Sequence, residues 1–171
     1  MRVAPFEYSN EEIKQSLNVI RLPLSIALVA VGNPFNIGVI IRVAHSFLVK
    51  NIFLIGEESY YMKPTMGMHK YENIVVIPTE QEFIEKTNDY TRVAFERETA
   101  TETLNKSKLP LDNPLFIFGS EQFGLSRYII DNCQRRVVIE MNGINNSLPV
   151  SVAASIAINE WCRQYYEYVR S

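Results

Sequence analysis

The sequence predicts an α/β fold in which a mainly parallel sheet carries helices on both faces. Short apolar runs of strand length alternate with longer segments of helical pattern along the whole chain. Several of these runs are almost continuously apolar, which is typical of strands covered on both faces. The length of 171 residues and the apolar content of 47% suit one compact domain with a substantial core.

The polar residues 1–20 are predicted to form a short N-terminal extension, and residues 21–171 a single domain. Within the extension, Ser9-Asn10-Glu11-Glu12 is typical of a helix start, because serine caps the helix and acidic residues favour its first turn. The run Ser25–Val31 follows as the first strand of the sheet.

A helix is predicted over Asn36–Val49, apolar on nearly every face and therefore mostly buried. Asn36 stands where an N-cap is expected, just after Pro34. A second strand over Asn51–Gly56 ends in glycine, and a third over Ile74–Ile77 is stopped by a proline.

The middle of the chain continues the alternation. A helix is predicted over Gln81–Thr87 and a fourth strand over Thr91–Phe95. The stretch Glu96–Pro114 is rich in Thr, Lys and Asn, so we expect a loop with at most one helical turn. A fifth strand over Leu115–Gly119 leads into a short helix over Leu125–Asn132.

The chain is predicted to close with a sixth strand over Arg136–Met141 and a long helix from Val150 to about Tyr168. The small residues at the start of this helix suggest tight packing against another backbone. Its apolar stripe is broad enough to face both the sheet and a second subunit; it consists of Ile156, Trp161, Cys162, Tyr165 and Val169.

Composition excludes several classes of protein. The two cysteines, Cys133 and Cys162, make no disulfide framework, and without a signal peptide they favour a reducing cytoplasm. No apolar run approaches the length that crosses a bilayer. His45 and His69 are isolated from the cysteines, so no metal site is expected. With a net charge of −2, charge alone does not indicate a nucleic acid partner.

The most informative segment is Leu115–Ser126, where a buried strand runs into a glycine, a carboxylate and a second glycine. Gly119 has no Cβ, so its backbone can turn sharply and a ligand can approach it closely. Glu121 is then placed at the carboxyl end of a strand, the edge where open α/β sheets bind ligands. The plainer interpretation is a solvated glutamate in a strand-to-helix loop.

Arg42 is the one certain charge in the apolar helix that follows the first strand. A buried guanidinium is costly unless it meets an anion or several acceptors. One interpretation is an internal ion pair, for instance with Glu121. The other is a guanidinium kept ready for a phosphate, for which its forked donors and permanent charge are suited.

A third segment, Val138–Ala154, combines a strand, a polar loop with three asparagines, and serines entering a helix. Either Ser147 or Ser151 can cap that helix, and Ser151 is the preferred cap. The glycines of the chain are scattered singly, so neither a dinucleotide-binding fingerprint nor a phosphate-binding P-loop is present.

Together, the three segments resemble the SpoU/TrmH family of the SPOUT superfamily, which are S-adenosylmethionine-dependent RNA 2′-O-ribose methyltransferases. Order and spacing fit over roughly residues 25–165. The matching positions are Asn36, Gly38, Arg42 and Ala44 in the first motif, Gly119, Ser120, Glu121, Gly124 and Ser126 in the second, and Ser147, Leu148, Val150, Ser151 and Ala153 in the third.

The resemblance implies a SPOUT-like sheet whose C-terminal segment is threaded into a deep trefoil knot, a rare feature that composition does not suggest. It also implies a homodimer whose active site is completed across the interface, with tRNA or rRNA as substrate. The residues implied for catalysis are Arg42, Asn36, Glu121 and Ser147. Those implied for S-adenosylmethionine are Glu96, Gly119, Ser120, Ile139, Met141, Ser147 and Leu148.

Two positions depart from the family pattern: Pro149 replaces an asparagine, and Glu140 stands where a proline is frequent. Because Pro149 falls in the catalytic region, one alternative is an RNA- and cofactor-binding homologue with lost or altered methyl transfer. Another is a nucleotide-binding module used for protein interaction. A phosphate track would be drawn from Lys63, Lys70, Arg92, Arg97, Lys106, Lys108 and Arg127.

Overall fold

The computed structural model of the protein describes residues 8–56, 59–145 and 147–171. Its centre is a seven-stranded sheet in the order β3-β2-β1-β6-β4-β7-β5, and every pairing between these strands is parallel. The strands are β1 (Ser25–Val29), β2 (Ile52–Ile55), β3 (Ile74–Ile77), β4 (Thr91–Phe95), β5 (Glu102–Thr103), β6 (Pro114–Phe118) and β7 (Arg135–Val138).

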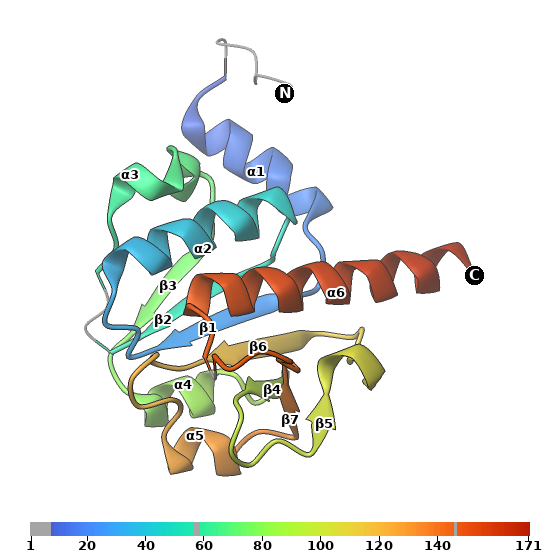
Figure 1. Ribbon diagram of the computed structural model, residues 1–171. Coiled ribbons are helices and arrows are strands. Elements are labelled where there is room, and N and C mark those ends of the chain that lie inside the picture. Colours follow the sequence, from blue (N-terminus) through green and yellow to red (C-terminus); the bar gives the residue numbers. More distant parts are fainter. Residues whose placement is uncertain (1–7, 57–58, 146) are drawn as a thin grey trace.

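Helices cover both faces of the sheet, as predicted (Figure 1). On one face lie α2 (Pro34–Ser46) and α6 (Val150–Arg170), and on the other lie α4 (Glu80–Lys86) and α5 (Arg127–Asp131). The first helix, α1 (Asn10–Ile20), lies beyond α2 and contributes no residue to the core. Shorter turns of helix are α3 (Met62–Thr65), η1 (Met68–Lys70) and η2 (Leu104–Lys106). Among the described residues, no helix is long and apolar enough to span a bilayer.

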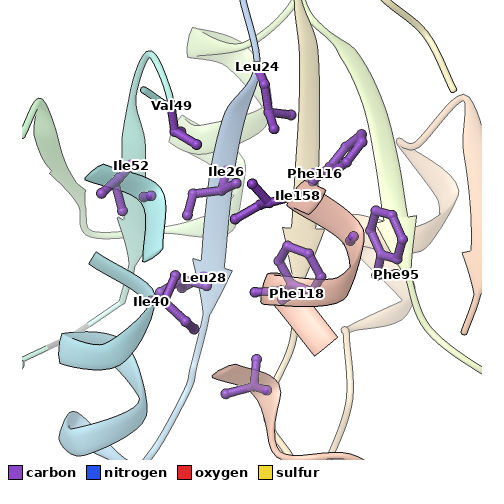
Figure 2. Packing of buried hydrophobic residues seen from close by; sticks show 14 of the residues in the cluster. Leu24, Ile26, Leu28, Ile40, Val49, Ile52, Phe95, Phe116, Phe118 and Ile158 are labelled. Carbon is purple, nitrogen blue, oxygen red and sulfur yellow. The ribbon is translucent and has the colours of Figure 1, made fainter. Parts of the chain in front are cut away.

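Alternation along the strands divides the core into two layers. On β1, Ile26 and Leu28 face α2 and α6, whereas Ala27 faces α4 and α5. Figure 2 shows the first layer, in which Phe116 of β6 and Ile158 of α6 meet between helix and sheet. Because both faces are covered, β1 and β6 are buried along their full length, which explains their continuous apolar sequence.

The predicted strands over Ile74–Ile77 and Thr91–Phe95 are confirmed with the same bounds. The sixth strand was predicted to reach Met141 but ends at Val138. The register explains this, because β4 accompanies β7 only to Val137 and β5 accompanies it only to Val138. The backbone beyond has no neighbouring strand, so it leaves the sheet.

The prediction of a loop over Glu96–Pro114 was wrong in one respect. Its one helical turn is present as η2, but β5 also adds an edge strand next to β7. Two residues are too few for a period-2 pattern to be visible in the sequence. The short elements α3 and η1 also carry no periodic signal and were not predicted.

Two predicted helix caps were wrong. Asn33, not Asn36, caps α2, and its side chain accepts a hydrogen bond from the N–H of Phe35. Ser151 lies within α6, whose cap residue is Pro149. The side chains of Asn36 and Ser151 are therefore available for other contacts.

The N-terminal extension begins with the predicted helix start. Ser9 and Glu12 form a reciprocal capping box at the start of α1, and residues 1–7 lie outside the described part of the chain. No residue of α1 is buried. Just after α1, the buried guanidinium of Arg21 bonds the buried carboxylate of Glu72 at 2.8 Å and so ties this end of the chain to the domain.

Candidate functional site

A cavity of about 370 Å³ lies at the carboxyl ends of β4, β6 and β7. Three segments distant in sequence line it: the end of β4 with residues 96–99, the loop 119–125 after β6, and the segment from β7 to the start of α6. This is the edge of the sheet that the sequence indicated. Eight predicted residues line the cavity: Glu96, Gly119, Ser120, Glu121, Ile139, Met141, Ser147 and Leu148.

Gly119 is a glycine because the backbone of its own loop occupies the space of a side chain. A Cβ at this position would lie 2.4 Å from the carbonyl carbon and oxygen of Gly124 and 2.7 Å from the nitrogen of Leu125. The group that approaches Gly119 is therefore the backbone of this loop, and the predicted close approach of a ligand stays a prediction.

The loop after β6 is held in a compact turn. The N–H of Gly124 donates to the carbonyl of Ser120 at 2.8 Å, and Gly124 takes a φ of 67°, a conformation that favours glycine. The hydroxyl of Ser120 accepts hydrogen bonds from the N–H groups of Gln122 and Phe123. These bonds fix the direction in which Glu121 leaves the loop.

Glu121 joins the three motif segments at the rim of the cavity. Its Oε1 accepts a hydrogen bond from Asn36 Nδ2 at 2.5 Å and another from the N–H of Val150 at 3.2 Å. Ser151 Oγ completes the chain by donating to Asn36 Oδ1 at 2.9 Å. A carboxylate at the N-terminus of α6 is also favoured by the helix dipole.

The other polar residues of the cavity differ in their availability. Both carboxylate oxygens of Glu96 accept hydrogen bonds from the N–H of Thr99, and Oε1 also accepts one from the Thr99 hydroxyl. The Glu96 side chain therefore stabilises the turn after β4. Ser147 is exposed at the rim, and its N–H donates to Asn145 Oδ1. The third asparagine of this loop, Asn146, lies outside the described residues.

The wall of the cavity is apolar where β4 and β6 end. Phe95 and Phe118 stack with their ring centroids 5.0 Å apart. Strand alternation places both rings in the first core layer. Their contact could not be predicted from the sequence, because Phe95 and Phe118 are 23 residues apart and lie on different strands.

Arg42 is exposed on α2, contrary to the prediction of a buried guanidinium. The internal ion pair with Glu121, one of the two interpretations of Arg42, is absent. Within the described part of the chain its guanidinium has no hydrogen-bond or ion-pair partner. The prediction failed because α2 is covered by the sheet and α6 on the face of Ile37 and Ile41, whereas Arg42 lies off that face.

Sequence reasoning missed Ser151 as a member of the site. Ser151 matches the third motif, but a helix cap is the nearest explanation for a serine at that position in the sequence. The structure also removes Arg92 from the predicted phosphate track, because it is buried and donates to the carbonyl of Ile84. Arg127 is exposed but paired with Asp131.

The cysteines take no part in the cavity. Burial raises the pKa of the Cys133 thiol to about 11, and burial raises that of Cys162 to about 11 as well. Both are therefore neutral thiols at pH 7 and poor nucleophiles. Among the described residues, no three side chains of His, Cys, Asp or Glu are grouped so that they could hold a metal ion.

Comparison with known proteins gives one family. The sequence model of the SpoU rRNA Methylase family matches residues 23–159. A relative from Acinetobacter baylyi, named 23S rRNA (guanosine-2′-O-)-methyltransferase RlmB, is 29% identical over 175 residues; the match covers 95% of this chain and 68% of the relative.

Two solved structures share the fold. A. aeolicus TrmH/SpoU tRNA modifying enzyme superposes with a TM-score of 0.81 at 24% identity, over 94% of this chain and 86% of that chain. The SpoU methyltransferase AviRb from Streptomyces viridochromogenes, in complex with the cofactor AdoMet, gives a TM-score of 0.75 at 22% identity. That match covers 83% of this chain and only 57% of AviRb, so the chain spans little more than half of that protein.

Proposed function

Because the chain belongs to the SpoU rRNA Methylase family, we propose that it is an S-adenosylmethionine-dependent RNA 2′-O-ribose methyltransferase. The name of the Acinetobacter baylyi relative supports ribose 2′-O transfer, and the AdoMet complex of AviRb supports the cofactor. Within this chain, the observation that carries the proposal is the Asn36–Glu121 hydrogen bond, which joins two motif segments at the rim of one cavity.

The cavity suits the proposed cofactor in size and lining. About 370 Å³ falls within the range of small-molecule sites. The stacked Phe95 and Phe118 offer an apolar wall to a purine, and Ser120, Met141 and Leu148 offer backbone groups around it. S-adenosylmethionine would supply a methyl group on a positively charged sulfur, which the ribose 2′-oxygen would accept while losing its proton.

Arg42 is proposed to grip the phosphate next to the target ribose. A guanidinium keeps its proton in proteins, which makes it a poor general base and a strong phosphate ligand. Glu121 and Asn36 would orient the nucleotide and the loop after β6, and Ser147 would hold the substrate hydroxyl or the cofactor. The proton would leave to that phosphate or to water.

The proposal includes a homodimer and a C-terminal trefoil knot. In one chain Arg42 is exposed and has no contact with the Asn36–Glu121 pair, and a second copy that presents its Arg42 to this cavity would complete the site. The knot rests on the family and on the meeting of the segments 119–125 and 139–148 around one cavity. Two free cysteines support a reducing cytoplasm as the compartment.

Calorimetry with S-adenosylmethionine and transfer of its labelled methyl group to total RNA would test the function. We expect saturable cofactor binding, and labelled product that contains alkali-resistant dinucleotides, because a 2′-O-methyl group prevents hydrolysis at that ribose. Cofactor and RNA binding without methyl transfer would favour the alternative of a homologue that has lost the transfer activity, which is suggested by Pro149. No cofactor binding would contradict both.

The assignment of Arg42 has its own test. Arg42→Ala and Arg42→Lys are expected to lower turnover more than tenfold while cofactor affinity stays unchanged, because a forked phosphate contact is worth about 1.5–3 kcal/mol. Arg170→Ala, another exposed arginine of the described chain, serves as the matched control. Turnover near that of the parent in both Arg42 variants would show the assignment to be wrong.

A further inference from the structure

A second surface of the chain is built around Gly38 of α2. Phe35, Gly38 and Arg42 stand at positions i, i+3 and i+7, so they share one face of the helix. A Cβ at Gly38 would lie 2.6 Å from the carbonyl oxygen of Tyr61 and 3.1 Å from Cβ of Pro64. The α3 segment therefore packs on this face of α2 in backbone contact at Gly38. Figure 1 shows α3 next to α2.

This crossing exposes large apolar side chains. Tyr61 is 61% exposed, Met62 66% and Met66 64%, and Phe35 beside them is 54% exposed. The N–H of Tyr61 donates to the carbonyl of Pro34 at 3.2 Å, which fixes Tyr61 next to Phe35. We call these four residues, Phe35, Tyr61, Met62 and Met66, the α3 surface. None of them lines the cavity.

The charged residues of the segment 59–71, which carries three of these four side chains, are positive, although the whole chain carries a net charge of −2. Residues 59–71 contain Lys63 and Lys70 and no aspartate or glutamate. Both lysines are exposed, and Arg42 adds a guanidinium with no partner among the described residues. An anionic ligand with flat apolar groups complements this combination.

We propose that the α3 surface binds a single-stranded segment of the RNA substrate; this inference rests on the proposed function. Bases stack on Tyr61 and Phe35, and phosphates meet Lys63 and Lys70. Aromatic rings flanked by cations are the usual means of holding unpaired nucleotides, because every base has a face that can stack. A partner protein with an apolar face would gain nothing from two desolvated lysines.

The position of the α3 surface connects it to the cavity. Asn36 follows Phe35 in α2 and donates to Glu121 at the cavity rim. An RNA segment held on Tyr61 and Phe35 would therefore lie next to the end of α2 from which Asn36 reaches this rim. The α3 surface would thus hold nucleotides that flank a target ribose, and would set how much unpaired RNA the protein requires.

Binding of a fluorescent single-stranded oligouridylate, followed by anisotropy, tests the inference. Tyr61→Ala is expected to weaken binding about tenfold, because stacking of a base is worth roughly 1–3 kcal/mol. Tyr61→Phe keeps the stacking face and is expected to bind like the parent, whereas Tyr61→Leu keeps apolar area alone and is expected to bind weakly. Lys63→Gln is expected to reduce the salt dependence of log K by about 0.7.

Matched controls come from the same chain. Tyr168 is 66% exposed at the C-terminal end of α6, and Lys50 is exposed just before the amino end of β2. Tyr168→Ala and Lys50→Gln should therefore leave RNA binding unchanged. Calorimetry with S-adenosylmethionine checks each variant for an intact cavity. Unchanged RNA affinity in Tyr61→Ala and Lys63→Gln, with methyl transfer retained, would overturn this inference and leave the proposed function standing.

Two further outcomes count against the inference. If Tyr61→Ala shifts the oligomeric state in sedimentation, the α3 surface is a contact between copies of the chain. If the parent binds the cofactor but no single-stranded RNA, the α3 surface has another occupant, and the alkali-resistant product assay then decides separately whether methyl transfer occurs. Tenfold weaker RNA binding at unchanged cofactor affinity and oligomeric state would support it.

Discussion

Asn36 and Glu121 lie 85 residues apart in the sequence, yet Asn36 Nδ2 donates a hydrogen bond to Glu121 Oε1 at 2.5 Å. The same oxygen accepts from the N–H of Val150 at the start of α6. One carboxylate thus holds together α2, the loop after β6 and α6. The three motif segments are therefore expected to respond to substitution as one unit.

Substitution of Asn36 and Glu121, singly and together, should show that α2 and the loop after β6 are energetically coupled. Glu121→Ala removes the acceptor of both the Asn36 amide and the Val150 N–H, so we expect the free energy of unfolding to fall by about 1–3 kcal/mol. A double-mutant cycle with Asn36→Ala, measured by urea unfolding, should give a coupling energy of about 0.5–3 kcal/mol. Asp89→Ala, an exposed carboxylate at the other edge of the sheet, is the control. Additive effects would mean that the hydrogen bond does not couple the two segments.

Gly119→Ala should disturb the cavity without unfolding the sheet. The new Cβ would meet the backbone of Gly124 at 2.4 Å, so the loop after β6 must move and Glu121 must move with it. We expect cofactor affinity to fall at least tenfold in calorimetry, with the helical circular dichroism unchanged. Gly143→Ala is the matched control, because its nearest contact lies at 4.0 Å. Equal affinity in the two variants would contradict this account of Gly119.

The longer strands, the longer helices and the edge of the sheet that carries the cavity could be predicted from local pattern. Buried strands such as Ser25–Val29 and Pro114–Phe118 are recognisable because both faces are covered, which makes their sequences continuously apolar. The resemblance to the SpoU/TrmH family then indicated which loops meet. The β5 strand could not be predicted, because its two residues are set only by pairing with β7.

The contacts of the polar site residues could not be predicted either. Asn33 and Asn36 are both plausible caps at the start of α2, and tertiary contacts decide between them: Asn36 is used by Glu121 and Ser151. Burial of Arg42 was inferred from apolar neighbours in sequence, but burial depends on which helix face meets the sheet and α6. Periodicity gives the width of an apolar face and not what covers it.

Glu72 is expected to be the charge on which stability depends most. Its side chain is 1% exposed and contacts Arg21 and His45, both at 2.8 Å. Glu72→Ala leaves the buried guanidinium of Arg21 without an anion, and breaking such a pair costs about 3–5 kcal/mol. Urea unfolding would measure the loss, with Glu98→Ala, an exposed carboxylate, as control. A loss below about 1 kcal/mol would mean that the carbonyls of Val49 and Tyr71 satisfy Arg21 alone.

Pro149→Asn restores the residue that the family carries. Pro149 is the cap residue of α6 and makes no side-chain cap bond, so an asparagine can add one and should raise the free energy of unfolding by about 0.5–2 kcal/mol. If the family asparagine also aids transfer, turnover should rise with it. Methyl transfer and urea unfolding of the variant and the parent would measure both effects. An unchanged rate would mean that the asparagine is dispensable in this chain.

We expect the two buried cysteines to make the free energy of unfolding fall at high pH. Burial raises the pKa of Cys133, and that of Cys162, from the ordinary 9.0 to about 11 in the folded protein. Between these values the unfolded chain loses its thiol protons first, so the folded state is destabilised as pH rises from about 9 to about 11. Urea midpoints should therefore fall more steeply over this range in the parent than in the variant Cys133→Val with Cys162→Val. In the folded parent at pH 8, iodoacetamide should modify both thiols slowly, and urea should make the reaction fast. Rapid modification of the folded protein would show that the thiols are accessible and their pKa values ordinary.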